Sequence, residues 1–448
     1  MTSLAVIGGG ITGLAAARQG VSLGCDVTVF EASDRWGGCI DTTPLAGHDI
    51  DVGPDAFLCR EASAVALCDE LGLTLTSPAA SSAGVLRHGM LRQIPRGTLL
   101  GIPGDPMVLR KAGMVGWAGA LRASIEPWLP LRPLRADTDI ASFVKHRIGA
   151  SVFNATVGPL VGSIHAGRAD DLSVRAVIPG LVSISQHHKS LRRAAQLHQV
   201  QDGPAFARPV DGMVSIANAL VASLQNDATL VCSSPVRCVS ALNGSWRVDD
   251  EKFDAAVIAV PAHIALGMLD RPIGELAEIR TAGVSMVLVA YAAAEVAFAP
   301  DHSGFLVAPD QPGIMTAASF MSNKWPGIGD ESLFITRISA GRAGDERHLT
   351  MPDSALTAHL LAEFAAATGV TATPLDTAVR RWPDAFAQYR PGHLELVAAL
   401  RAALPQRLAV AGASYDGVGI PACIRSGAHA AASALQSFAP TSKPSPRG

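Results

Sequence analysis

The chain has little charge and almost no excess of either sign. Charged residues make up 17% of it, and 36 lysines and arginines face 39 aspartates and glutamates, which gives a net charge of −3 at pH 7. Nucleic-acid-binding proteins usually carry a clear basic excess, because phosphate contacts supply much of their affinity. The near balance therefore argues against a nucleic-acid partner, and we expect none.

Cysteines are few, and their spacing suits neither a metal site nor a disulfide framework. The seven cysteines contain no Cys-x-x-Cys pair and are odd in number. This pattern is typical of reduced thiols in a cytoplasmic protein. We therefore expect a cytoplasmic location and no bound metal.

Long hydrophobic runs are also missing. The longest, at about 255–269 and 281–294, fall short of the roughly 20 residues that a membrane helix requires, and they predict strands leading into helices. We expect no export signal, because the first glycine motif arrives at residue 8. A chain of 448 residues with 48% hydrophobic residues predicts two or three folded domains. The Pro/Ser/Lys-rich end, 440–448, predicts a disordered tail.

A dinucleotide-binding motif is present in residues 4–17, LAVIGGGITGLAAA. A strand, a GxGxxG turn and an Ala-rich helix place a pyrophosphate at the helix N-terminus. A second strand ends at Glu31, where a Rossmann unit places the acid that binds the adenosine ribose. The predicted phosphate-binding turn comprises Gly8, Gly9, Gly10, Ile11, Thr12 and Gly13.

A second glycine turn follows Glu31 and favours FAD over NAD. An arginine closely followed by two glycines exposes backbone beside the first turn, and a further strand-end glycine comes some fifteen residues later. The doublet resembles the signature of the FAD-containing amine oxidase superfamily. Taken alone, these glycines are also typical of ordinary turns. The predicted contacts are Ala32, Arg35, Gly37, Gly38, Gly53 and Pro54.

The FAD-binding fold is expected to return at 208–262. The pattern predicts a helix after a glycine turn, a strand pair with an Asn-Gly turn in 232–248, and a buried strand ending in proline. In the superfamily the first strand of that pair passes the adenine, which implies that Val236 contacts it through its backbone. An ordinary core valine is the alternative.

Residues 86–135 carry eight basic residues against two acids, interleaved with tryptophan, methionine and leucine. We interpret this segment as a basic helical region. Such a region can rest on an anionic membrane surface, gather anionic substrates, or present an ordinary solvated face. The three alternatives stay open at this point.

Residues 408–431 predict a buried strand, a glycine-rich turn and a helix beginning near Pro421, whose N-terminus suits the N1/O2 edge of a reduced flavin. This segment resembles the oxygen-dependent protoporphyrinogen/coproporphyrinogen oxidase family, whose flavin-closing pattern is GxxYxGVxIxxCI. Further similar segments are 91–106, 158–175, 188–193 and 381–404. The matching residues are Gly412, Tyr415, Gly417, Val418, Ile420, Cys423 and Ile424. Gly412, Val418, Gly419 and Ile420 are the expected flavin contacts.

The resemblance implies an FAD enzyme that oxidises a porphyrinogen to the porphyrin in haem biosynthesis, with molecular oxygen as the electron acceptor. The many arginines favour the tetra-anionic coproporphyrinogen III over protoporphyrinogen IX. Two alternatives remain: an amine oxidase or carotenoid desaturase of the same superfamily, and a non-catalytic dinucleotide-binding protein. A peripheral contact with the inner face of the cell membrane and a homodimer are left open.

The resemblance also implies substrate-side residues. These are Leu306, Ser319 and Ser339 on a sheet and the backbone of Gly167, while His165 is a candidate proton acceptor. Arg337 is a candidate partner of a propionate, because a guanidinium binds a carboxylate through two hydrogen bonds. The chain departs from the family pattern at Ala83, where many relatives carry a propionate-anchoring arginine, and at Ala422, where they carry aspartate.

The predicted fold is α/β: a discontinuous Rossmann-type FAD-binding domain, a sheet-based substrate domain and a helical domain. We expect the FAD-binding domain in residues 1–80, 206–265 and 381–439, the substrate domain in 81–104 and 266–380, and the helical domain in 105–205.

Overall fold

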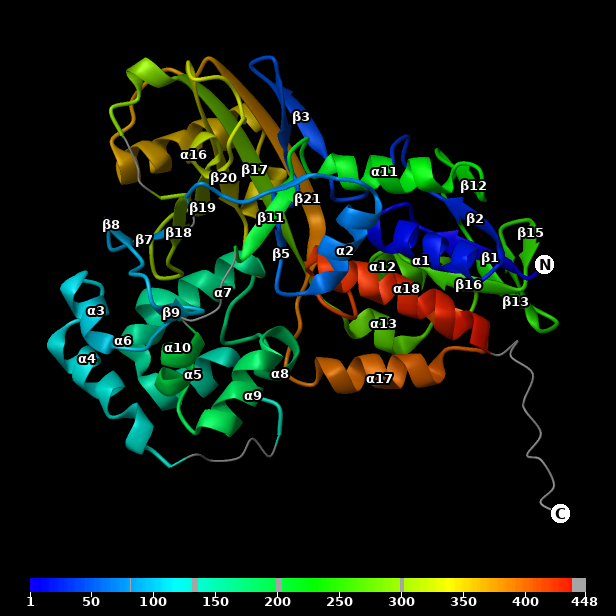
Figure 1. The fold of residues 1–448 in the computed structure, drawn as a ribbon, viewed down its shortest axis with the longest axis horizontal. Coiled ribbons are helices and arrows are strands. Elements are labelled where there is room, and N and C mark those ends of the chain that lie inside the picture. Colours follow the sequence, from blue (N-terminus) through cyan, green and yellow to red (C-terminus); the bar gives the residue numbers. More distant parts are fainter. Residues whose placement is uncertain (81, 131–135, 199–203, 299–301, 437–448) are drawn as a thin grey trace.

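The structure is a computed structural model, and it describes all residues except 81, 131–135, 199–203, 299–301 and 437–448. The predicted tail lies outside the described residues. Figure 1 places a parallel sheet with its helices on the right, a larger sheet at the upper left, and a helical part at the lower left. Within the described part of the chain, no helix is both long and apolar enough to cross a bilayer.

The parallel sheet has the order β12-β2-β1-β16-β22 and is assembled from three separate stretches of chain. Its strands are β1 (Ser3–Ile7), β2 (Asp26–Phe30), β12 (Ala228–Val231), β16 (Ala255–Ile258) and β22 (Leu408–Val410). Strand β1 lies in register with both neighbours, so that Val6 is opposite Val29 and Val257. The predicted discontinuous Rossmann-type fold is confirmed.

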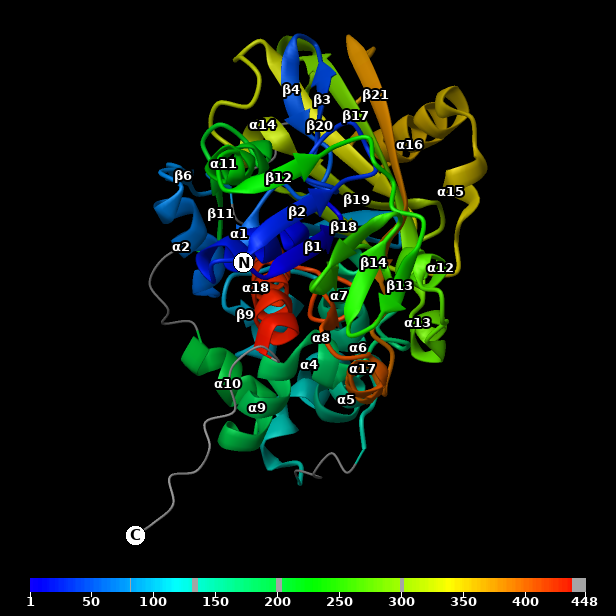
Figure 2. The same cartoon turned by 90° about the vertical axis from the view of Figure 1, so that its right-hand side faces the viewer.

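Helices cover both faces of this sheet because alternate side chains of its buried strands point to opposite sides. Three helices pack on one face: α1 (Ile11–Ser22), α11 (Val214–Leu224) and α18 (Ile420–Gln436). The other face meets α12 (Ala262–Met268), α17 (His393–Ala403) and a small antiparallel sheet. Figure 2 shows strands β13 and β14 of that small sheet beside β1.

The small sheet consists of β13 (Val239–Leu242), β14 (Ser245–Val248) and β15 (Glu251–Phe253). Its first turn is Asn243-Gly244, with φ of 45° and 81°, as a tight hairpin with both central residues left-handed requires. The predicted Asn-Gly strand pair is therefore confirmed. Val236 precedes β13, however, and lies in the loop after β12, so its placement on the first strand was wrong.

The larger sheet has the order β21-β17-β20-β19-β18-β7-β8. Its strands are β7 (Gly84–Arg87), β8 (Met90–Gln93), β17 (Thr281–Ala292), β18 (Gly304–Val307), β19 (Met315–Phe320), β20 (Leu333–Ala340) and β21 (Asp376–Ala387). One face packs on α16 (Asp353–Thr368) through Phe305, Phe320 and Phe364, which are buried. The first part of the basic region, 86–93, belongs to this sheet, so its interpretation as wholly helical was wrong. In this segment, the pairing of β7 with β18 determines the structure, and the local sequence pattern does not.

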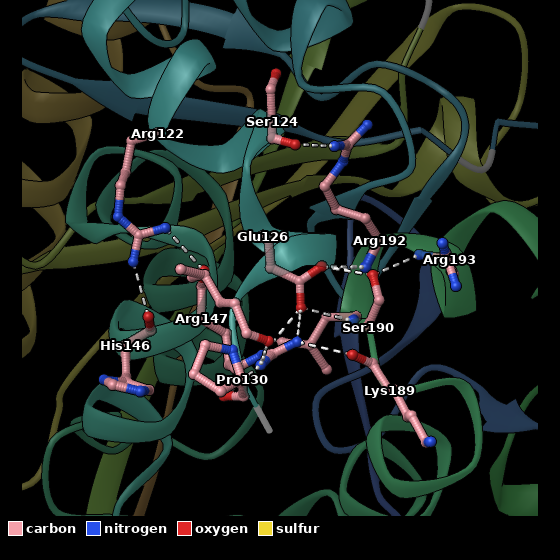
Figure 3. A network of polar contacts seen from close by, with 12 residues as sticks. Arg122, Ser124, Glu126, Pro130, His146, Arg147, Lys189, Ser190, Arg192 and Arg193 are labelled. Carbon is pink, nitrogen blue, oxygen red and sulfur yellow. Dashed lines mark hydrogen bonds and ion pairs between the residues drawn. The ribbon is translucent and has the colours of Figure 1, made fainter. Parts of the chain in front are cut away.

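The helical part begins at Pro106 and forms its own core. It contains α3 (Pro106–Lys111), α4 (Trp117–Ser124), the 3-10 turn η1 (Glu126–Trp128), α5 (Ile140–Ile148), α6 (Ala150–Val152), the π-helical turn η2 (Phe153–Val157), α7 (Gly158–Ile164), α8 (Val174–Val177), α9 (Pro179–His188) and α10 (Leu191–His198). Figure 3 shows the fully buried Glu126 accepting hydrogen bonds from Arg147, from the Ser190 hydroxyl and from the start of α10. This network ties η1 to α5 and α10.

The remaining elements connect these parts. They are the hairpin β3 (Thr42–Leu45) and β4 (His48–Asp51), the strands β5 (Phe57–Leu58), β6 (Leu75–Thr76), β9 (Thr98–Leu99), β10 (Ile102–Pro103) and β11 (Phe206–Pro209), the helices α2 (Ala62–Glu70), α13 (Gly274–Glu278), α14 (Met321–Lys324) and α15 (Arg347–Thr350), and the 3-10 turn η3 (Ala293–Glu295).

Candidate active site

The first glycine turn has the geometry that a bound pyrophosphate needs. Gly8 has a φ of +106°, and a Cβ at Gly13 would lie 1.8 Å from the Gly8 carbonyl oxygen. These two positions therefore require glycine for the turn and for the packing of α1 on β1. A Cβ at Gly10 would meet nothing nearer than the Gly38 Cα at 3.8 Å. The space ahead of the α1 N-terminus, at Ile11, is thus open to a ligand.

The second glycine turn lies directly beside the first. The Gly37 amide donates to the Gly9 carbonyl at 2.9 Å, and both Gly37 and Gly38 have positive φ, of 105° and 59°. Arg35 braces this turn, because its guanidinium donates to the Gly38 carbonyl at 2.7 Å and to the Ile40 carbonyl at 3.2 Å. The two predicted turns therefore form one backbone-lined surface.

Glu31 lies at the edge of that surface. One carboxylate oxygen accepts from the Gly9 amide at 2.6 Å, and the other accepts from the amide and hydroxyl of Ser33. The loop after β12 also meets this point, because the Ser234 amide donates to the Glu31 carbonyl. This loop contains Val236, so the structure brings Val236 close to the segment of Glu31 although it is not in a strand. Ala32, next to Glu31, is exposed.

The loop before α18 forms the third part of the site. Helix α18 begins at Ile420, one residue before the predicted start, and its Gly427 packs so closely on α1 that a Cβ would lie 2.0 Å from the Thr12 carbonyl oxygen. The two helices thus bring their N-termini to the same side of the parallel sheet. Val418 is half-buried and Gly419 is exposed, so the peptides ahead of α18 are open.

This loop is fixed by side chains that the sequence did not single out. The Tyr389 hydroxyl donates to the Ala413 carbonyl at 2.6 Å and accepts from the Gly417 amide at 2.7 Å. The His393 ring stacks on Tyr389 at 4.0 Å. Burial raises the pKa of Tyr389, so the phenol stays protonated, and burial lowers the pKa of His393 to about 4. The sequence indicated Tyr389 and His393 only by their place in the segment QYRPGH, which precedes the flavin motif of residues 408–431.

A second brace holds the same loop from the other side. The Gly412 amide donates to the Ser426 hydroxyl at 2.8 Å, and that hydroxyl donates to Asp416. Arg401 also binds Asp416, at 2.7 Å. Ala422 lies in the first turn of α18 and is buried, so no carboxylate faces the loop at this position.

The predicted substrate-side residues share one face of the larger sheet. Leu306 is opposite Ala317, Ala317 is opposite Ser339, and the row continues through Met286 to Arg380. We call these five residues the strip. All five are half-buried, whereas the opposite face of the same strands is packed against α16. Ser319 lies on the same face, one row away.

Two segments cover the sheet on either side of the strip. The β3–β4 hairpin packs over Leu288 and Ala290 through Leu45 and Ile50. On the other side, Ala166 packs on Ala282 and Val284. The strip is the part of this face left between them. Its β21 end adjoins the glycine turns, because Arg380 forms an ion pair with Asp41 at 2.8 Å.

The turn at His165–Gly167 borders the strip and is held by Gln388. The Gln388 amide nitrogen donates to the His165 carbonyl at 3.0 Å, and a Cβ at Gly167 would lie 2.5 Å from the Gln388 amide oxygen. Burial lowers the pKa of His165 to about 4, so its imidazole is neutral at physiological pH. The same burial makes this imidazole a weaker base than that of a solvated histidine.

Arg337 lies on the same face but is buried against the chain after β4. It donates to the Gly53 carbonyl at 2.8 Å and to the Asp51 carbonyl at 3.2 Å, and it pairs with Asp55 at 3.4 Å. Burial alone would raise the pKa of Asp55, but Lys324 and Arg337 hold it well below its usual range. The predicted role of Arg337 as a propionate partner would require these contacts to break.

Comparisons with known proteins agree with this geometry. The model of the family described as flavin containing amine oxidoreductase matches residues 11–435. The chain therefore belongs to that family, and it is an FAD-dependent oxidoreductase, as the glycine turns predict. The cofactor fits the open backbone surface at Gly10, Gly38 and Gly419.

Within this family, the chain is similar along almost its whole length to porphyrinogen oxidases. The chain is similar to a coproporphyrinogen III oxidase of Mycobacterium leprae (35% identity over 97% of this chain and 98% of the relative) and to one of Bacillus subtilis (29% identity over 96% and 97%). A crystal structure from Exiguobacterium sp. 255-15, provisionally assigned as a protoporphyrinogen oxidase, superimposes with a TM-score of 0.87 at 26% identity, over 96% of this chain and 98% of that chain. The predicted resemblance is confirmed.

Proposed function

We propose that the protein oxidises coproporphyrinogen III to the porphyrin, with FAD as the hydride acceptor and molecular oxygen as the final electron acceptor. The observation that carries the proposal is the strip: a half-buried, largely apolar row on the sheet that adjoins the glycine turns through Asp41 and Arg380. The pyrrole rings of a porphyrinogen are apolar and need an apolar floor of this kind beside the flavin. The full-length similarity to coproporphyrinogen III oxidases supports the same substrate.

The cofactor would be held mainly by backbone. The amides at the start of α1, at Ile11 and Thr12, would bind the pyrophosphate, and Glu31 would bind the ribose. The backbone near Val236 would meet the adenine, and the open peptides at Val418–Ile420 would face the flavin ring. FAD supplies the hydride-accepting chemistry when it is bound.

The protein side chains would position the substrate and exclude water. Leu306, Met286 and Ala317 would support the macrocycle, and Ser339 and Ser319 would border it. Aromatisation of the ring drives the oxidation, so pyrrole protons can leave to backbone carbonyls such as that of Gly167 or to water. We propose His165, whose backbone turn borders the strip, as an additional proton acceptor.

The test is to purify the yellow holoenzyme and measure porphyrin fluorescence with coproporphyrinogen III and protoporphyrinogen IX separately. We expect flavin bleaching without oxygen, recovery of the flavin absorbance in air, and faster oxidation of coproporphyrinogen III. Failure to oxidise either substrate would favour an amine oxidase or a carotenoid desaturase, and a colourless protein would favour a non-catalytic binding protein. Faster oxidation of protoporphyrinogen IX would overturn only the substrate preference.

We also propose a peripheral contact between the helical part and an anionic membrane. Four large apolar side chains at helical spacing, on α4, on η1 and at the residue between them, are between 48% and 78% exposed, and we call them the ridge. Figure 1 shows α4 at the outer edge of the helical part. The ridge consists of Trp117, Leu121, Ile125 and Trp128. The described charges on α3 and α4 are basic: Arg110, which lies 3.6 Å from the Trp117 ring centroid, Lys111 and Arg122.

The buried Glu126, which lies between Ile125 and Trp128 of the ridge, is hydrogen-bonded to Arg147 and Ser190 (Figure 3). These bonds fix the position of η1 on the helical part. Cosedimentation with vesicles should increase with anionic lipid and fall with salt, and Trp128→Ser with Leu121→Ser should abolish it. Vesicle binding that ignores both lipid charge and these substitutions would contradict the proposal. The same preparations, run by size-exclusion chromatography, test whether the protein forms a homodimer.

A further inference from the structure

Arg380 is the cation at the end of the strip that adjoins the second glycine turn. It lies opposite Met286 on β21, which is an edge strand of the larger sheet, and its side chain is 38% exposed. Its guanidinium lies over the Trp382 ring at 4.7 Å, and Trp382 in turn donates to the Val52 carbonyl at 3.0 Å. The side chain is therefore held in place while part of it stays accessible.

The counter-ion of Arg380 is shared with a second arginine. Asp41 pairs with Arg380 at 2.8 Å and with Arg35 at 3.2 Å. Two guanidinium cations thus face one carboxylate, which leaves one positive charge uncompensated. Arg35 also gives hydrogen bonds to the carbonyls of its own turn. The uncompensated charge is consequently presented mainly by Arg380, at the end of the apolar row.

Other cations on this face are less suited to a ligand carboxylate. Arg337 is buried against Gly53 and Asp55. At the far end of the same row, Arg92 on β8 binds the Gly113 carbonyl and is separated from Leu306 by the buried Val85. Ala83, where the family resemblance implies an arginine in many relatives, lies just before β7, at the side of the sheet away from β21.

We propose that Arg380 binds a carboxylate of the substrate and thereby selects a tetracarboxylate over a dicarboxylate macrocycle. This inference rests on the proposed porphyrinogen oxidase function. A tetracarboxylate carries a propionate on every pyrrole, so that one reaches Arg380 in any orientation on the strip. A macrocycle with two propionates on adjacent pyrroles can instead place its apolar edge there.

The test compares Arg380→Ala with Arg381→Ala in the holoenzyme. Arg381 is the matched control, because it is the next residue of β21, lies on the other face and pairs with Asp353. For Arg380→Ala we expect kcat/KM on coproporphyrinogen III to fall about ten- to a hundredfold, mostly through KM, because a charge-assisted hydrogen bond is lost. We expect about a twofold change or less on protoporphyrinogen IX, and no selective change for Arg381→Ala.

Arg380→Lys tests whether the charge alone is enough, because lysine keeps the positive charge but cannot donate two parallel hydrogen bonds. Its KM for coproporphyrinogen III should lie between those of the wild type and Arg380→Ala. If Arg380→Ala loses kcat/KM equally on both substrates, or loses bound FAD, this inference is wrong. The proposed function would still stand in that case, provided that the wild type oxidises a porphyrinogen. A wild type that oxidises neither porphyrinogen would overturn the proposed function, and the inference with it.

Discussion

The cofactor-binding surface and the strip are built from different kinds of constraint. The cofactor-binding surface consists of backbone that only glycine allows, through a positive φ at Gly8 and Gly37 and through a close backbone contact at Gly13. The strip consists of ordinary side chains brought together by strand pairing between β18, β19, β20, β17 and β21. A substitution in the first should therefore disrupt folding or cofactor binding, whereas one in the second should alter only which substrate is bound.

The largest effects are expected within the first glycine turn, where two neighbouring glycines should behave differently. Gly13→Val should prevent folding of the FAD-binding domain, because its side chain would overlap the Gly8 carbonyl. Gly10→Val should fold but purify colourless, because it fills the open space ahead of α1. Circular dichroism and flavin absorbance distinguish the two results. Stoichiometric FAD in Gly10→Val would contradict the assignment of this space to the pyrophosphate.

The same difference explains what the sequence could predict. The GxGxxG turn, the hairpin at Asn243-Gly244 and the start of α18 depend on local conformation, and all three were found where the pattern placed them. Leu306, Ser319 and Ser339 were grouped on one sheet only through the family resemblance. Arg380 was not nominated at all, because its place opposite Met286 depends on pairing across almost a hundred residues.

Segments whose structure depends on distant partners account for the errors. Val236 was placed in a strand, but the chain after β12 stays with Glu31 before it enters β13. Residues 86–93 were interpreted as helical and instead extend the larger sheet beside β18. Tyr389 is a further case, because its hydroxyl donates a hydrogen bond to the loop before α18, more than twenty residues away. No local pattern specifies such contacts.

The next largest effect concerns pH, because the loop before α18 rests on a histidine that folds in its neutral form. His393 is buried, and its pKa falls from 6.5 to about 4. Between pH 6.5 and pH 4 the unfolded chain therefore binds a proton at His393 that the folded chain does not bind. The contribution of neutral His393 to the free energy of unfolding is fully present above pH 6.5 and is lost as the pH falls toward 4. The free energy of unfolding should decrease by up to about 3 kcal/mol over that window.

Urea unfolding at several pH values measures this slope. His165, whose pKa is also lowered to about 4, contributes to the same window and lies at the edge of the strip. His393→Gln and His165→Gln should therefore each reduce, but not abolish, the dependence of the free energy of unfolding on pH. An unchanged slope in His393→Gln would show that this ring is not the group that titrates. His359, which is exposed on α16 beside Glu363, provides the control.

A smaller effect is expected from the Tyr389 brace, which holds the loop before α18. Tyr389→Phe removes the hydroxyl that joins the Ala413 carbonyl to the Gly417 amide. Leaving these groups unpaired should cost about 1–3 kcal/mol and weaken FAD binding, because the loop before α18 loses its support. Tyr291→Phe, a buried tyrosine on the α16 side of β17, is the control for loss of a phenol. Equal FAD affinity in both variants would show that the brace does not reach the cofactor.

The smallest effect is expected at Glu31, where a single side chain serves an otherwise backbone-built surface. Its carboxylate accepts from the Gly9 amide and from Ser33, so Glu31→Gln keeps the shape but turns one acceptor into a donor. We expect FAD to bind more weakly by about 1–2 kcal/mol, or roughly five- to thirtyfold in Kd, with the glycine turns intact. Fluorescence titration of apoprotein with FAD measures this loss. Asp34→Asn, in the same loop but exposed, should leave the Kd unchanged. If both substitutions weaken binding equally, the effect reflects the net charge of the loop and not a ribose contact, and the cofactor surface would then depend on backbone alone.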